Sequence, residues 1–163
     1  MTAASALRRP RSRPGVVSQI AVPPQARALS TLSRIDYEDA FLLQADGGRT
    51  AEQWARAILE GAALTMRCRL RAGWSAIGLK LDRAPSERSV LGWEIRRITP
   101  DLVLLGAGSR IGMPGELLFK RERRGLLFAT FVRHGNPVAG ALWGRVERVH
   151  VATVRRLLAA VAP

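Results

Sequence analysis

The chain has 163 residues, of which 47% are hydrophobic and 24% are charged, so it is long enough for one domain with a core and too short for two ordinary domains. Its single cysteine excludes a disulfide scaffold, and two histidines with one cysteine cannot complete a four-ligand Cys/His zinc site. The 26 basic residues outnumber the 13 acidic ones, and the resulting net charge of +13 raises the question of an anionic partner.

Residues 1–33 contain no acidic residue, are interrupted by prolines, and carry Arg8, Arg9, Arg11, Arg13 and Arg27. Such a segment buries too little apolar surface to offset the entropy of ordering, so it predicts a disordered basic tail before one domain over residues 34–163. Two alternatives remain open for this tail. Arg8 and Arg9 before an apolar stretch imitate a twin-arginine export signal, although prolines interrupt the pattern, and the arginines would also bind polyanions weakly.

One strand and two helices are predicted at the start of the domain. Residues 35–45 are typical of a strand, and Thr50 with Gln53 forms a capping-box pattern before a helix over 51–59. Residues 66–72 alternate as a strand would, whereas residues 66–81 keep a helical spacing of apolar residues. The helical pattern is the longer of the two and favours a second helix.

Four further strands are predicted over residues 88–98, 102–107, 116–122 and 126–133, as an antiparallel meander. Alternation places the polar side chains of Glu94, Arg96, Lys120, Glu122 and Arg133 on one face of this sheet. The opposite face, which we expect to be covered, carries Leu91, Trp93, Ile95, Leu117, Phe119, Phe128, Thr130 and Val132.

The last segment predicts one long helix that covers this apolar face. Asn136 is placed to cap it, Pro137 takes its first position, and one apolar stripe follows. The stripe consists of Val138, Leu142, Val146, Val149, Thr153, Leu157 and Val161. A helix over about 25 residues is on the order of 37 Å long, which suffices to cross the whole sheet.

This order of elements resembles the helix-grip arrangement of the START-like, Bet v 1-like and polyketide cyclase (SRPBCC) superfamily. The resemblance rests on IDYEDAFLLQADGGRTAEQWARAIL, LVLLGAGSR, ELLFKRERRGLLFATFVRH and NPVAGALWGRVERVHVATVRRLLAAV, and these segments are similar to an uncharacterised bacterial family within it. The resemblance implies an α+β fold in which a curved antiparallel sheet wraps around the C-terminal helix, with two helices after the first strand. Fuller members have six or seven strands, whereas the pattern here predicts five.

The resemblance further implies an apolar cavity between the sheet and the last helix, with a lipid-like, polyketide-like or aromatic ligand. Its lining here would be Trp93, Phe119, Phe128, Val132, Leu142 and Trp143. The alternative for each of these residues is an ordinary place in a filled core.

Few residues suggest catalysis. His134 ends the last predicted strand on the inward side, where an imidazole at the cavity mouth would act as general acid or base, and a strand end that faces water is the alternative. His150 is expected at the edge of the last helix. Cys68 has arginine neighbours that favour a thiolate, but no histidine partner lies nearby in the sequence. The glycines of residues 106–112 have the wrong spacing for a dinucleotide loop.

These patterns favour a protein that binds a small hydrophobic or amphipathic molecule, with no cofactor and no metal. Whether it is an enzyme stays open, and the superfamily suggests cyclase or dehydratase chemistry by analogy alone. The alternatives are non-enzymatic binding of a polyanion through the arginines and a structural domain with a filled core. Nucleic acid is not favoured as a partner, because the four tryptophans occupy stripe or inward positions. No apolar run approaches the roughly 18 residues of a membrane span, and a cytoplasmic location is expected.

Overall fold

The structure, a computed structural model, describes residues 15–45 and 48–162. Its elements are β1 (Val17–Ile20), α1 (Pro24–Arg27), β2 (Tyr37–Gln44), α2 (Ala51–Leu59), α3 (Leu64–Ala76), β3 (Leu79–Lys80), β4 (Ser89–Val90), β5 (Trp93–Thr99), β6 (Leu102–Ser109), β7 (Gly115–Glu122), β8 (Gly125–Val132) and α4 (Pro137–Ala160). The strands form one antiparallel sheet in the order β1-β2-β8-β7-β6-β5-β4, and β3 pairs with the end of β6.

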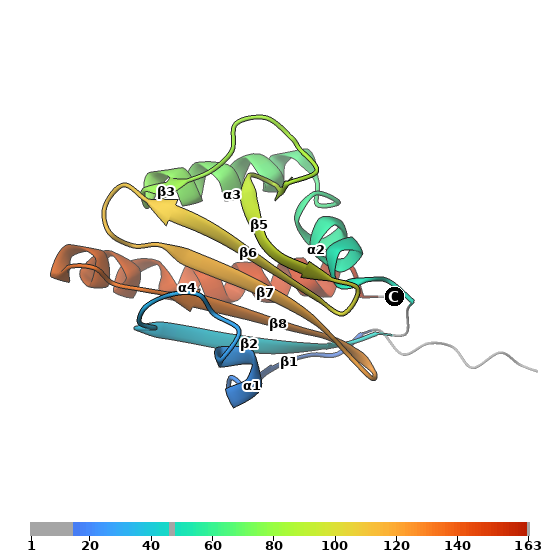
Figure 1. Ribbon diagram of the computed structural model, residues 1–163. Helices are drawn as coiled ribbons and strands as arrows, with labels where there is room; N and C mark the ends of the chain where they lie inside the picture. The colour runs from blue at the N-terminus through green and yellow to red at the C-terminus, as the bar shows by residue number, and fades with distance from the viewer. Residues whose placement is uncertain (1–14, 46–47, 163) are drawn as a thin grey trace, which may run out of the picture.

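The predicted α+β helix-grip fold is confirmed. α4 crosses behind the curved sheet in Figure 1, while α2 and α3 follow β2 and lie along the β5 and β6 side of the sheet. No helix within residues 15–45 and 48–162 is long and apolar enough to cross a membrane.

Local capping signals locate two of the helices. Thr50 Oγ1 accepts a hydrogen bond from the Gln53 backbone N–H, and the Gln53 side chain accepts one from the Thr50 backbone N–H, which completes the predicted capping box of α2. Asn136 caps α4 by accepting a hydrogen bond from the Ala139 N–H, with Pro137 in the first turn. Both helix starts were therefore predicted correctly.

The second helix is real, but its predicted end is wrong. α3 stops at Ala76, and residues 79–80 pair with β6 instead of continuing the helix to residue 81. The reason is Gly78, whose φ of +81° is a left-handed conformation that ends a helix and that glycine adopts without strain.

The sheet has eight strands in the described residues rather than the five predicted. The stretch 88–98 is divided into β4 and β5 by a tight turn at Leu91 and Gly92, whose φ angles are +47° and +91°. β1, β3 and β4 are each two to four residues long, which is too short for an alternating pattern to be recognised.

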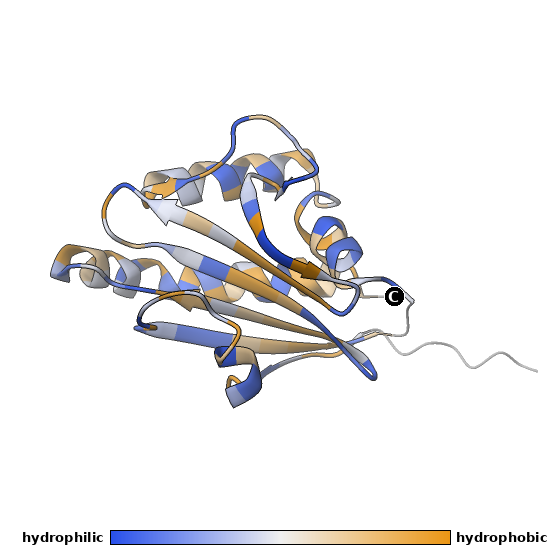
Figure 2. Ribbon diagram, viewed as in Figure 1, coloured by the Kyte–Doolittle hydropathy of each residue, from blue (hydrophilic) through white to orange (hydrophobic). Residues whose placement is uncertain are grey.

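The sheet is apolar on both faces. The inner face, under α2, α3 and α4, carries residues such as Phe41, Val103 and Phe119. The outer face carries a second buried cluster that includes Leu104, Leu118 and Phe131. The expectation of a single covered face is therefore wrong for the central strands, which Figure 2 shows as long hydrophobic stretches.

The outer cluster explains why the predicted disordered tail is wrong for residues 15–33. β1 pairs with β2, and α1 with the chain that follows it lies in front of the sheet in Figure 1, against the outer face. Ala26 packs there together with Ile20, Val22, Leu29, Leu32 and Ile35. Burial of this apolar surface offsets the entropy cost of ordering the segment. The composition of the segment alone did not indicate this burial. Residues 1–14, with Arg8, Arg9, Arg11 and Arg13, lie outside the described residues.

A buried carboxylate fastens this N-terminal segment to the sheet. Glu116 of β7 is fully buried on the outer face, where it accepts hydrogen bonds from the Thr31 backbone N–H at 3.1 Å, the Thr31 hydroxyl, and Ser30 Oγ at 2.5 Å. Arg96 Nη1 of β5 forms an ion pair with the same carboxylate at 2.8 Å. The Arg96 side chain reaches Glu116 across Gly106, where any Cβ would collide with the guanidinium.

We expect Glu116→Gln to lower the free energy of unfolding by about 3 kcal/mol, because it leaves Arg96 and two hydroxyl donors around a buried neutral group. Chemical denaturation measures this change. Tryptic cleavage after Arg27 and Arg34 should accelerate in the same variant, because the segment loses its anchor.

Glu94→Gln is the matched control, because Glu94 is an exposed carboxylate on the same face, in register with Gly106. Its effect should stay within about 0.5 kcal/mol. Equal stabilities of the two variants would contradict the anchoring role of Glu116.

Candidate ligand-binding site

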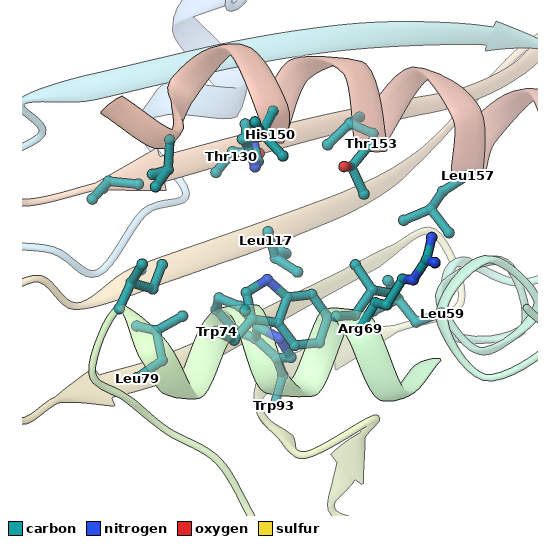
Figure 3. A pocket seen from close by; sticks show the side chains of 18 of the residues that line it. Leu59, Arg69, Trp74, Leu79, Trp93, Leu117, Thr130, His150, Thr153 and Leu157 are labelled. Carbon is teal, nitrogen blue, oxygen red and sulfur yellow. The ribbon is translucent and has the colours of Figure 1, made fainter. Parts of the chain in front are cut away.

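A cavity of about 460 Å³ lies between the inner face of the sheet, α3 and α4. Helices α2 and α3 contribute Ile58, Leu59, Met66, Arg69, Leu70, Gly73 and Trp74; the strands contribute Leu79, Trp93, Gly115, Leu117, Phe128, Thr130 and Val132; α4 contributes Trp143, Val146, Val149, His150, Thr153, Val154, Arg156, Leu157 and Leu158; and Ile77 and Met113 complete the lining. Figure 3 shows the side chains of α3 and α4 directed toward one another across this space.

Aromatic side chains form much of the wall. Trp74 of α3 meets Trp93 of β5 edge to face, with ring centroids 5.3 Å apart and an interplanar angle of 87°. Phe128 lines the sheet side, and Trp143 lines the α4 side. Both indole N–H groups of Trp93 and Trp143 are buried and have no hydrogen-bond partner among the described residues.

The structure brings four of the six predicted lining residues to this cavity: Trp93, Phe128, Val132 and Trp143. Phe119 does not line it, because the ring is fully buried and packs against Phe128 at a centroid distance of 5.1 Å. Leu142 also lies outside the lining and packs with a separate cluster that contains Met113 and Val132.

A buried polar cluster adjoins the cavity where α4 crosses β2 and β8. His150 Nε2 lies 3.1 Å from Asp39 Oδ2 and 3.2 Å from Thr130 Oγ1, and Tyr37 donates its hydroxyl to the same Asp39 oxygen at 2.8 Å. The Asp39 carboxylate and the Thr130 hydroxyl both lie within hydrogen-bonding distance of this one ring nitrogen. These contacts fix the orientation of the imidazole beside the cavity, which His150 also lines.

Tyr37 is protonated throughout the ordinary pH range. Burial raises the pKa of its phenol far above the usual value, and the negative charge of Asp39 raises it further. Trp143 packs against both aromatic members of the cluster, with centroid distances of 4.8 Å to Tyr37 and 5.3 Å to His150. The cluster therefore offers a neutral phenol, a fixed imidazole and a buried carboxylate beside an apolar space.

His134 does not line the cavity, in contrast to its predicted place at the mouth. Its backbone N–H donates to Asp36 Oδ2 at 2.6 Å, its carbonyl accepts from Arg34 Nη2 at 2.6 Å, and its ring lies against the first turn of α4 at Gly140. The Arg34 side chain, which donates to Asp36, lowers the pKa of that carboxyl below its usual range. His134 thus belongs to the connection between β8 and α4.

His150 is the functional candidate that sequence reasoning missed. One signal was present, because Tyr37 and Asp39 are two residues apart on an inward strand face and Asp39 is directly opposite Thr130 in the β2 and β8 register. A carboxylate and a hydroxyl at paired inward positions indicate a buried polar partner. The choice of His150 as that partner depends on the rotation of α4 about its axis, which no local pattern specifies.

The structure places no further functional groups beside the remaining candidates, Cys68 and the glycines of residues 106–112. Cys68 is a free, exposed thiol on α3. The glycines of residues 106–112 lie in β6 and in the turn after it rather than before a helix. In the part of the chain that the structure describes, no group of three or more His, Cys, Asp or Glu side chains is arranged to hold a metal ion.

α3 is the least firmly attached wall of the cavity. Only Leu70 among its 13 residues is buried, and its N-terminus has no side-chain cap. Its contacts with the connections between β3 and β5 include Arg71, which donates to the carbonyls of Leu91 at 3.1 Å and Asp82 at 2.8 Å. A helix with little buried surface opens at low free-energy cost, so α3 is the element through which a ligand would enter.

No family model matches this chain, and no curated protein matches its sequence. Among solved structures, the crystal structure of CalU16 from Micromonospora echinospora is similar over 88% of this chain and 84% of that chain, with 11% sequence identity and a TM-score of 0.36.

The single tyrosine allows a direct test of the buried cluster. We expect the tyrosinate absorbance of the native protein to be absent at about pH 10, where half of a free phenol is ionised, and to appear at that pH in urea. Because the pKa is raised in the folded state, the contribution of Tyr37 to stability is present below that pH and falls as the pH rises. Tyr37→Phe should reduce this loss, and a native midpoint near the free value would contradict burial beside Asp39.

Hydrogen exchange tests the attachment of α3. Its amides should exchange roughly tenfold faster than those of α2 and α4, because few buried contacts oppose its opening. Arg71→Gln should accelerate α3 further and leave α2 unchanged, since Arg71 connects α3 to Leu91 and Asp82. Equal protection of α2 and α3 would be inconsistent with an entrance at this helix.

Proposed function

We propose that this protein binds a small hydrophobic or amphipathic molecule in the cavity between the sheet and α4. The observation that carries the proposal is an apolar, aromatic-walled space of about 460 Å³ with a few polar groups at its edge. Small-molecule sites have this character and commonly occupy roughly 300 to 1,000 Å³. An unfilled apolar cavity lowers stability because its lining atoms lack contacts, so occupancy by an apolar molecule would stabilise the fold.

The chemistry of the walls indicates what the ligand must offer. Trp74, Trp93 and Phe128 favour flat or chain-like apolar groups, with which aromatic rings make large contact areas. His150 and the unpartnered indole N–H groups of Trp93 and Trp143 favour a ligand that also carries hydrogen-bonding atoms. The filled-core alternative does not account for this combination of empty space and unpartnered donors.

Membership of the helix-grip superfamily of START-like and polyketide cyclase proteins is part of this proposal. The shared order of elements and the gripped C-terminal helix support it. If a cyclisation or dehydration takes place, its proton acceptor must lie at the cavity, and among the two histidines His150, not His134, meets that requirement.

Filling the cavity tests the proposal. Thr153 lies on α4 and points into the space, so Thr153→Phe should lower the affinity for a neutral fluorescent probe, N-phenyl-1-naphthylamine, by roughly tenfold or more, because the ring occupies the site. Ala152→Phe is the matched control, since Ala152 is the exposed neighbour on the same helix and does not line the cavity. Its affinity should equal that of the unaltered protein.

Native mass spectrometry provides an independent check. A defined additional mass that is lost on denaturation and reduced in Thr153→Phe would support a ligand retained from the cell. Absence of any retained mass, together with no binding of the probe and no thermal stabilisation by a panel of lipids and aromatic compounds, would refute the proposal.

A further inference from the structure

We propose that the ligand is an anionic amphiphile whose negatively charged group binds between Arg69 of α3 and Arg156 of α4, with its apolar part inside the cavity. This inference rests on the proposed function and specifies the class of molecule. The observations that carry it are the charge of the cavity lining and the positions of these two guanidinium groups.

The lining carries positive charge with no acidic residue. Arg69 and Arg156 both line the cavity, and no Asp or Glu is among the residues that do. Asp39, the acid of the polar cluster described above, does not line the cavity and is already in hydrogen-bonding contact with His150 and Tyr37. The field at the opening is therefore positive, and it favours an anion over a neutral or cationic group.

The guanidinium groups of Arg69 and Arg156 have no carboxylate partner in the described part of the chain. Other arginines of this protein do have one. Arg56 is paired with Glu52 and Glu60, and Arg96 is paired with Glu116. Neither Arg69 nor Arg156 forms an ion pair with any described residue, and both are exposed. Their hydrogen-bond donors are consequently available to a ligand.

The two arginines lie on two helices that face each other across the apolar space. In Figure 3, Arg69 extends from α3 toward Leu157 of α4. Arg156, which precedes Leu157 in the sequence, also lines the cavity. His150 lies six residues before Arg156, which corresponds to roughly 9 Å along a helix axis. An apolar chain or ring system entering from Arg69 would thus pass Thr153 and approach His150.

Arginine suits this task because its planar guanidinium donates two parallel hydrogen bonds to a carboxylate or phosphate, while its methylene stem covers apolar surface. Two such residues on opposite helices would also hold α3 against α4 when the anion is present. Carboxylates and phosphate esters share this chemistry.

The test compares ligands with one apolar chain and different charge: dodecanoate, dodecyl phosphate, dodecanol and dodecylamine, each below its micelle concentration. Their affinities are measured by displacement of the neutral probe N-phenyl-1-naphthylamine. We expect at least one of the two anions to bind roughly tenfold more tightly than dodecanol, and dodecylamine to bind most weakly, because charge-assisted hydrogen bonds form only with the anions.

The variant Arg69→Gln/Arg156→Gln should abolish the preference for anions while the neutral probe still binds. Arg145→Gln/Arg148→Gln is the matched control, because it removes the same charge from exposed α4 positions outside the cavity lining. The control should retain the preference. Preference for dodecanoate over dodecyl phosphate would identify the anion as a carboxylate, and the reverse order would identify it as a phosphate ester.

The outcomes separate this inference from the proposed function. If the probe and dodecanol bind but neither anion binds more tightly, the cavity binds a ligand and the assigned charge is wrong. If both double variants lose the preference equally, the net charge of the protein explains it, and the assignment to Arg69 and Arg156 is overturned. If neither the probe nor any amphiphile binds, the proposed function fails and this inference fails with it.

Discussion

The architecture depends on one constraint, which is that the central strands are apolar on both faces and each face must be covered. Leu104, Leu118 and Phe131 point away from α4 and are fully buried, so the sheet cannot have an open outer surface. Glu116 helps to cover the outer face through polar contacts. It binds Ser30, Thr31 and Arg96 within the outer layer and fixes the position of the covering segment. A buried carboxylate is expensive to desolvate, and here four donors surround it.

The inner face differs from the outer face, because its cover leaves a cavity. α4 lies over the β2 and β8 side and includes the buried side chains of Val154, Leu157 and Leu158, whereas only Leu70 of α3 is buried. The space left between these helices is the cavity. The outer layer is therefore anchored at a buried carboxylate, whereas one wall of the cavity has little buried surface.

Features with a local cause could be read from the sequence. Thr50 with Gln53 and Asn136 with Pro137 specify helix starts because capping involves residues at most four positions apart. Strand alternation placed Trp93, Phe128 and Val132 on the inward face because side chains alternate strictly in a strand. These residues line the cavity for the same reason.

Features with a long-range cause could not be read in this way. The apolar residues of the N-terminal segment have no helical or alternating period, so their burial is visible only once the outer face is known. Leu91 lies in a left-handed conformation that leucine rarely adopts, and the hairpin at this position was therefore read as a continuous strand. Phe119 and Phe128 have the same inward orientation, yet only Phe128 borders empty space, because the packing of the helices above the sheet determines which inward residue remains uncovered.

The outer layer has a practical consequence for how the molecule can be divided. A chain shortened to begin at residue 34, where composition alone would set the domain boundary, would lack β1, one of the two partner strands of β2, and the segment that covers the outer face. Leu104, Leu118, Leu127 and Phe131 would then form a contiguous apolar surface, and β2 would become an unprotected edge strand. Such a fragment would self-associate, so the N-terminal segment acts as a built-in barrier to aggregation as well as a layer of the fold.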